Sequence, residues 1–176
     1  MDVFSENSIA QKPEVGYNKT GPRRTAGRKG KAQMKDFNRE ELIRRALDQQ
    51  KDAYAPYSNF LVSAAVLMDS GKIYTGVNVE NASYPAGICA ERNAIFHAAA
   101  CGERKIEAIA VVGGPNGKNK VLCAPCGICR QVMREFCDPK EMRVLLARTP
   151  DEYREMSLEE LLPVSFGPED LGGSDG

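Results

Sequence analysis

The sequence lacks any apolar run long enough to cross a membrane. Unbroken apolar runs, such as residues 64–68, are far shorter than the roughly 20 residues of a transmembrane helix. The first residues also lack the apolar core of a secretory signal peptide. We therefore expect a soluble, cytoplasmic protein that has no membrane partner.

The chain also lacks a net charge, although its charges are unevenly distributed. Residues 1–35 hold eight Lys or Arg against three Asp or Glu, whereas the remainder holds sixteen against twenty-one. Nucleic-acid binding needs clustered cations that neutralise phosphates. The mildly acidic body therefore argues against a nucleic-acid partner and favours a small-molecule substrate.

Residues 1–35 have few large apolar side chains. Such a composition cannot bury enough surface to offset the entropy lost on ordering, so we predict a disordered basic extension. The remaining length suits one ordinary domain. We expect this domain over residues 36–176, with a short C-terminal tail.

Hydrophobic periodicity predicts how the domain begins. Asn38 and Glu41 form a candidate capping box before apolar residues at helical spacing, and Pro56 blocks continuation of this helix. Apolar and β-branched residues then occupy 60–68 and 73–79, on either side of an Asp-Ser-Gly turn. This pattern predicts an antiparallel hairpin.

Two further units follow the hairpin. The first combines a helix over 89–101 with a strand over 106–112. The second opens with a strand over 120–123 and continues with a helix over 125–136 and a strand over 142–147. The series predicts an α/β domain in which helices pack on a mixed sheet.

Six cysteines cluster in a chain without a secretory signal, which favours a metal or catalytic role over disulfides. Cys126 and Cys129 form a CxxC pair, a pattern that also occurs in redox sites and structural zinc ribbons. The chain has no second separate pair, and Cys89 stands alone upstream. Three cysteine ligands would leave the fourth position of a zinc tetrahedron open for water, as hydrolytic sites require.

Three thiolates around a dication need compensating charge. Cys89 and Cys126 are each predicted at the start of a helix, whose dipole and free N–H groups would face the sulfurs. Arg92 could add a cation. Glu91 is the candidate proton carrier beside the metal-bound water; alternatively, it is only a carboxylate favoured at a helix N-terminus.

The run Cys89-Ala-Glu91-Arg92, together with Pro125-Cys126-Gly-Ile-Cys129-Arg130-Gln131, resembles the cytidine deaminase family in its three-cysteine form. The resemblance covers about residues 38–171. A first ligand of Cys rather than His favours the nucleoside enzymes over the nucleotide or polynucleotide branches. Further matching segments are Ala-Pro-Tyr-Ser-Asn-Phe at 55–60, Gly-Val-Asn-Val-Glu-Asn-Ala-Ser-Tyr at 76–84, Glu-Leu-Leu-Pro at 160–163 and Ser-Phe-Gly-Pro-Glu-Asp-Leu at 165–171.

The resemblance implies a three-layer α/β/α sandwich with a mixed, roughly five-stranded sheet. It also implies one Zn²⁺ per chain, held by Cys89, Cys126 and Cys129. The implied reaction is the hydrolytic deamination of cytidine and deoxycytidine to uridine and deoxyuridine in pyrimidine salvage, with Glu91 as acid and base. Arg92 would tune the charge of the zinc site.

Substrate contacts are also implied by the resemblance. Asn78 and Glu80 would hydrogen-bond the ribose, Phe60 would stack on the base, and the backbone near Ala90 would contact the base. Each has an alternative: Asn78 could only end a strand, Glu80 could be a solvated turn residue, and Phe60 could belong to the hairpin core.

The family is commonly tetrameric, so the resemblance implies a homotetramer with sites completed across subunits. The residues that would reach a neighbour's site are Ala82, Tyr84 and Phe166.

Four points stay open at this stage. Cys123 could compete as a metal ligand, although its position favours a packed thiol. Ser63 stands where the family usually has Gly and could tighten the pocket floor, while His97, the only histidine, suits a structural role. Rival functions are deamination of another aminopyrimidine or of cytidine within RNA, and a structural zinc module with a basic nucleic-acid-binding arm, which would need a fourth protein ligand.

Overall fold

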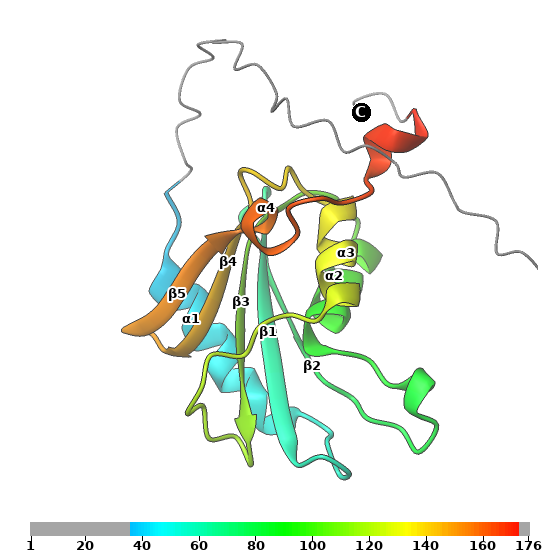
Figure 1. The fold of residues 1–176 in the computed structure, drawn as a ribbon. Helices are drawn as coiled ribbons and strands as arrows, with labels where there is room; N and C mark the ends of the chain where they lie inside the picture. Colours follow the sequence, from blue (N-terminus) through cyan, green and yellow to red (C-terminus); the bar gives the residue numbers. More distant parts are fainter. Residues whose placement is uncertain (1–35, 173–176) are drawn as a thin grey trace, which may run out of the picture. The chain divides into compact units, whose positions relative to one another are not determined.

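The computed structural model describes residues 36–172 (Figure 1). The predicted basic extension, residues 1–35, and the end of the predicted tail, residues 173–176, lie outside the described residues. Between residues 36 and 172 we find no helix with the length and apolar composition of a membrane span.

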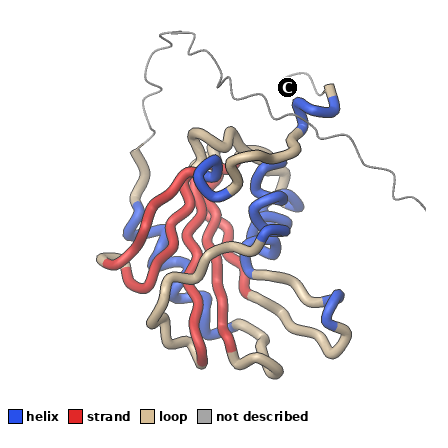
Figure 2. Tube along the Cα trace, in the orientation of Figure 1, coloured by secondary structure: helices blue, strands red, loops and turns tan. Residues whose placement is uncertain are grey.

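A five-stranded mixed sheet forms the centre of the domain (Figure 2). In chain order, its strands are β1 (Phe60–Met68), β2 (Ile73–Val77), β3 (Ile106–Pro115), β4 (Arg143–Thr149) and β5 (Glu152–Ser157). Their spatial order is β2-β1-β3-β4-β5, and only the β3–β4 pair is parallel. The predicted hairpin is thus β1 with β2, and the predicted mixed sheet is confirmed.

Helices cover both faces of this sheet, as Figures 1 and 2 show. α1 (Arg39–Gln49) buries Leu42 and Ile43 against one face. α2 (Ala90–Ala100) and α3 (Gly127–Glu135) pack on the opposite face. The predicted three-layer α/β/α arrangement is therefore confirmed. The shorter helices are η1 (Gln50–Asp52), η2 (Tyr84–Ala86), α4 (Leu158–Leu161) and η3 (Pro168–Leu171).

Capping residues fix the ends of the first two helices. The side chain of Asn38 accepts a hydrogen bond of 2.9 Å from the backbone N–H of Glu41, which satisfies one of the free donors at the start of α1. Gly102 follows α2 with a φ of 90°, a left-handed conformation that glycine adopts without steric cost. The start of α1 agrees with the predicted cap at Asn38, although only the bond to the Asn38 side chain is formed and not the reciprocal half of a capping box, and α2 ends close to the predicted residue 101.

The predicted strand at residues 120–123 is wrong. This segment is a loop in which Val121 and Leu122 are exposed. β3 is already paired on both sides, by β1 and β4, so the sheet offers no free edge beside it. The fifth strand is instead β5, an outer strand whose first residues are polar and exposed and therefore lack an apolar pattern.

Ser63 lies on the face of β1 that is turned toward α1. Ala64 belongs to the apolar layer beneath α2, and Ala65 belongs to the layer beneath α1. Because successive side chains of a strand point to opposite faces, Ser63 shares the face of Ala65. The expectation that Ser63 tightens the pocket floor is therefore wrong. The cavity of the candidate active site lies on the other face of β1 and is lined by Val62. The Ser63 hydroxyl is fully buried and has no hydrogen-bond partner.

Gly76 allows α2 to lie directly against β2. A Cβ atom at Gly76 would meet the backbone nitrogen of Ala94 and would lie 2.8 Å from the backbone oxygen of Ala90. No other residue type fits this position without moving the helix. The close approach sets where the N-terminus of α2 lies over the sheet.

Candidate active site

Two helix N-termini meet on one side of the sheet. Cys89 is the N-cap of α2 and Cys126 is the N-cap of α3, each with an extended backbone conformation. Cys129 lies in the first turn of α3 and is fully buried. The helix starts thus bring together three cysteines that come from two distant parts of the chain, as the sequence predicted.

The three sulfur atoms have the spacing of a tetrahedral metal site. The distance from Cys89 Sγ to Cys126 Sγ is 3.9 Å, and the distance from Cys126 Sγ to Cys129 Sγ is 3.5 Å. All three atoms lie within 4.8 Å of one another. Zinc–sulfur bonds of about 2.3 Å at tetrahedral angles require sulfurs about 3.8 Å apart, so the donor set fits zinc. Within residues 36–172, no other group of three potential ligands is this close together.

The surroundings of these sulfurs favour the thiolate form of Cys89. A hydrogen bond with Cys129, supported by Arg92, lowers the pKa of the Cys89 thiol to about 5. The same contact with Cys89, together with burial, raises the pKa of the Cys129 thiol. Arg92 Nη2 lies 3.7 Å from Cys89 Sγ, and its Nε atom is buried without a hydrogen-bond partner. The predicted compensating cation therefore lies beside the sulfurs.

Glu91 follows immediately in the first turn of α2. Only 4% of its surface is exposed, and this burial raises the pKa of its carboxyl group. A raised pKa makes the protonated form of a carboxyl easier to reach, which suits a group that carries protons. Its side chain faces the same cavity as Cys89 and Cys126.

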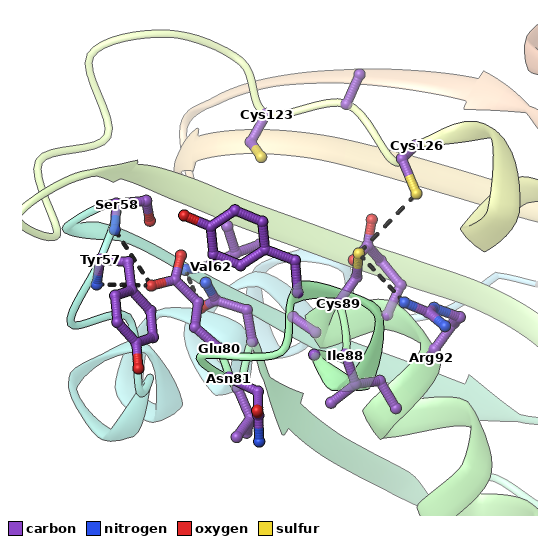
Figure 3. A pocket seen from close by; sticks show the side chains of 17 residues that line it. Tyr57, Ser58, Val62, Glu80, Asn81, Ile88, Cys89, Arg92, Cys123 and Cys126 are labelled. Atoms are coloured by element: carbon purple, nitrogen blue, oxygen red, sulfur yellow. Dashed lines mark hydrogen bonds between the residues drawn. The ribbon is translucent and has the colours of Figure 1, made fainter.

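This cavity has a volume of about 580 Å³. Figure 3 shows Cys89, Cys126 and Arg92 at one end of it and Glu80, Tyr57 and Ser58 at the other. The remaining lining residues are Val62, Asn78, Val79, Asn81, Tyr84, Gly87, Ile88, Ala90, Glu91, Cys123 and Ala124. The size suits one small molecule with a polar group at each end.

Glu80 is held by the backbone at the end of the cavity away from the sulfurs. Its Oε2 atom accepts hydrogen bonds from the N–H groups of Tyr57, at 2.9 Å, and Ser58, at 3.2 Å (Figure 3). Hydrogen bonding to the Ser58 side chain and to these N–H groups lowers the pKa of Glu80. The roles of Tyr57 and Ser58 were missed in the sequence, where only their family motif was apparent.

Asn78 connects the ends of β1 and β2. Its Oδ1 accepts a hydrogen bond of 2.8 Å from the N–H of Val62, and its Nδ2 donates one of 2.9 Å to the carbonyl of Phe60. The side chain thereby has a structural role, and it lines the cavity as well. One N–H of the amide group remains for a ligand.

The other candidate contacts are placed differently. Ala90 lines the cavity, as does Tyr84, whose ring is 79% exposed and lies 6.4 Å from that of Tyr57. Phe60, Ala82 and Phe166 are not among the residues that line the cavity. Phe60 is half-buried at the start of β1, and the other two are exposed.

Cys123 belongs to the cavity wall and not to the sulfur cluster. Its sulfur occupies space beside Gly113, where a Cβ atom would lie 2.9 Å from it. Burial raises the pKa of the Cys123 thiol to about 11, so that it stays protonated at neutral pH. His97 also stays apart from the site, because its ring packs edge-on against Tyr74 near the carbonyl of Thr75.

Comparisons with known proteins agree with this geometry. Residues 37–145 match the family model described as the cytidine and deoxycytidylate deaminase zinc-binding region. The chain belongs to the cytidine and deoxycytidylate deaminase family. Among curated relatives, a cytidine deaminase of Halalkalibacterium halodurans is 44% identical over 135 residues, which cover 77% of this chain and 98% of the relative.

Solved structures of this deaminase family support the assignment. Cytidine deaminase from Burkholderia pseudomallei shares 45% identity with a TM-score of 0.67, and the match covers 74% of this chain and 100% of the other. Cytidine deaminase from Mycobacterium tuberculosis shares 37% identity with a TM-score of 0.63, over 75% and 99% of the two chains. The predicted family, the fold, the class of enzyme and the zinc cofactor are thereby confirmed.

Proposed function

We propose that this deaminase hydrolyses cytidine and deoxycytidine to uridine and deoxyuridine, with release of ammonia. One observation carries the proposal: a buried carboxyl, Glu91, lines a cavity that has two sulfurs of the three-cysteine cluster, those of Cys89 and Cys126, at one end and a backbone-anchored carboxylate at the other. A nucleoside is small enough to enter this cavity and has a hydrolysable amine at one end and hydroxyl groups at the other.

Cys89, Cys126 and Cys129 would hold the zinc ion. When bound, zinc supplies Lewis acidity at the sulfur end of the cavity. Arg92 offsets part of the negative charge of the thiolates, because its guanidinium already contacts Cys89. The partial positive charges at the N-termini of α2 and α3 offset the negative charge of the thiolates further.

Glu91 would carry protons between the attacking water and the substrate. It would take one proton from that water and donate it to N3 of the pyrimidine ring as the hydroxide adds to C4. It would later take the second proton from the C4 hydroxyl of this adduct and deliver it to the amine, which leaves as ammonia. Its burial keeps its pKa raised, so that the protonated form is accessible during the reaction. The backbone near Ala90 lies beside it and would contact the base.

Glu80 and Asn78 would bind the sugar. Both backbone bonds to Glu80 go to Oε2, so Oε1 can accept a hydrogen bond from a ribose hydroxyl. Asn78 would use its second amide N–H for the same purpose. We also assign base stacking to Phe60, which requires its ring to turn toward the cavity from the start of β1.

A homotetramer in the cytoplasm, acting in pyrimidine salvage, completes the proposal. Tyr84 stands at the cavity with most of its ring exposed, while Ala82 and Phe166 are exposed residues away from the cavity of their own chain. Such residues are free to contribute to the site of a neighbouring subunit. The predicted domain over residues 36–176 with a basic extension remains part of the proposal.

An ultraviolet assay of the purified zinc protein tests the substrate. Cytidine and deoxycytidine should be deaminated, whereas CMP and adenosine should react far more slowly. The Glu91→Gln variant should keep its zinc but lose about 100- to 10,000-fold or more in kcat, because an amide keeps the shape of the side chain and cannot transfer protons.

Asn78→Ala serves as the comparison for a binding contact, and because it also removes the bonds of Asn78 to Val62 and Phe60, its thermal unfolding is measured alongside its kinetics. It should weaken kcat/KM by about 1 to 3 kcal/mol and still allow slow turnover. Near-normal turnover by Glu91→Gln with a full zinc content would show that Glu91 is only a helix-end carboxylate, and the mechanism would have to be abandoned.

A further inference from the structure

The C-terminal segment of the domain is tied to α3 by side chains of that helix. Gln131 Nε2 donates a hydrogen bond of 2.9 Å to the carbonyl of Phe166, and Arg134 Nε donates one of 3.1 Å to Ser165 Oγ. Arg134 is buried and also pairs with Glu169. These contacts hold residues 165–169 against the helix whose N-terminus carries Cys126.

Arg130 makes a different pair of contacts from the same helix. Its Nη1 donates a hydrogen bond of 2.9 Å to the carbonyl of Leu161, the last residue of α4. Its Nε donates one of 2.8 Å to the carbonyl of Pro125. Pro125 is buried and immediately precedes the N-cap residue Cys126. A single guanidinium therefore joins the end of α4 to the residue before a metal-ligating cysteine.

Both acceptors are carbonyls in need of a partner. The last carbonyls of a helix have no intrahelical donor, and Leu161 closes α4. Pro125 lies in the irregular loop before α3, outside the hydrogen-bond ladders of the sheet. The planar guanidinium presents several N–H donors in a rigid fork, so it can satisfy two carbonyls in fixed directions at once.

We propose that Arg130 is a positioning residue for zinc, because it holds the loop that presents Cys126 to the other two sulfurs. The proposal rests on the zinc ligands assigned above. Cys126 is exposed, whereas Cys129 is buried within α3, so the geometry of Cys126 depends on its loop more than on core packing. Outer partners that orient metal ligands typically contribute about 10- to 100-fold to metal affinity.

Zinc retention by the intact holoenzyme tests this role. The rate at which the colorimetric chelator 4-(2-pyridylazo)resorcinol removes zinc is measured for wild type and Arg130→Gln. We expect removal to be about 10- to 100-fold faster for Arg130→Gln, with the far-ultraviolet circular dichroism unchanged. Arg130→Lys should lie between the two, because an ammonium group can still donate to the carbonyls without the fork.

Arg134→Gln and Gln131→Ala are the matched controls, because both residues tie the C-terminal segment to α3 without contacting Pro125. Both controls should release zinc at the wild-type rate. A wild-type rate for Arg130→Gln, or an equally fast release from either control, would overturn the proposal. The chelator assay needs no substrate, so a zinc protein that failed to deaminate cytidine would refute the proposed function and leave this measurement intact.

Discussion

Side chains at the candidate site take their chemistry from contacts that the sequence only partly reveals. Cys89, at the start of α2, has a pKa of about 5 because Cys129 and Arg92 contact its sulfur. Cys123 lies three residues before Cys126, yet its pKa is about 11 because it is buried in the cavity wall. Cys89 and Cys123 thus differ in charge although both line the same cavity, and of these two only Cys89 is suited to hold a metal.

The buried hydroxyl of Ser63 predicts a gain in stability on its removal. Ser63→Ala should raise the free energy of unfolding by about 1 kcal/mol and the melting temperature by about 2–4 °C, because an unpaired buried hydroxyl is costly. Thermal unfolding measures this effect. Ser63→Gly removes the same hydroxyl but adds backbone freedom, so it should show a smaller gain or none. A loss of stability in Ser63→Ala would indicate that the hydroxyl has a partner in solution.

At the scale of elements, the site depends on how closely α2 approaches the sheet. The backbone of α2 at Ala90 and Ala94 packs so closely on Gly76 of β2 that no side chain fits between them, and this contact fixes the distance between the start of α2 and the strand. Cys89 is the N-cap of this helix, and to share a metal with Cys126 and Cys129 its sulfur would have to lie close to theirs, as it does. Helix packing and metal geometry are therefore coupled.

Gly76→Ala should destabilise the fold by about 1–3 kcal/mol and release zinc faster, because the added methyl group displaces α2. Thermal unfolding and the chelator assay measure the two effects. Gly127→Ala adds the same methyl group at the start of α3, where nothing lies within 4 Å, and should be tolerated. Wild-type stability of Gly76→Ala would contradict the tight α2–β2 contact.

For the whole molecule, the proposed homotetramer predicts complementation between two weak variants. Glu91→Gln subunits lack the proton carrier, and Phe166→Ala subunits lack the group offered to a neighbour. In coexpressed mixed tetramers, about a quarter of the sites would combine an intact Glu91 with an intact Phe166 from the adjacent subunit. Steady-state assays should then show more activity than the sum of the separate variants.

The double variant, Glu91→Gln with Phe166→Ala, provides the control for this experiment. Coexpressed with Glu91→Gln, it cannot form a complete site and should show no recovery. If the mixture of Glu91→Gln with Phe166→Ala recovers no more activity than this control, and both mixtures are tetramers by size, Phe166 does not contribute to the neighbouring site.

Features that depend on local sequence were predicted correctly. The helix starts at Asn38, Cys89 and Cys126, the β1–β2 hairpin and the grouping of three cysteines follow from capping chemistry, turn residues and spacing. The helix starts and the hairpin depend on signals within a few neighbouring residues, whereas the cysteine grouping was inferred because the pair Cys126 and Cys129 needs a third ligand to form a metal site. The local signals thus predicted an α/β domain, and the resemblance of the cysteine motifs predicted the family.

Only the tertiary structure decided the features that depend on pairing between distant segments. The fifth strand is β5 and not residues 120–123, because β3 is paired with β1 on one side and with β4 on the other and has no free edge for another strand. The tertiary structure also turned Ser63 away from the cavity and directed Arg130 to the carbonyls of Pro125 and Leu161. Strand register and helix packing set these contacts, and neither is encoded in the spacing of residues along one segment.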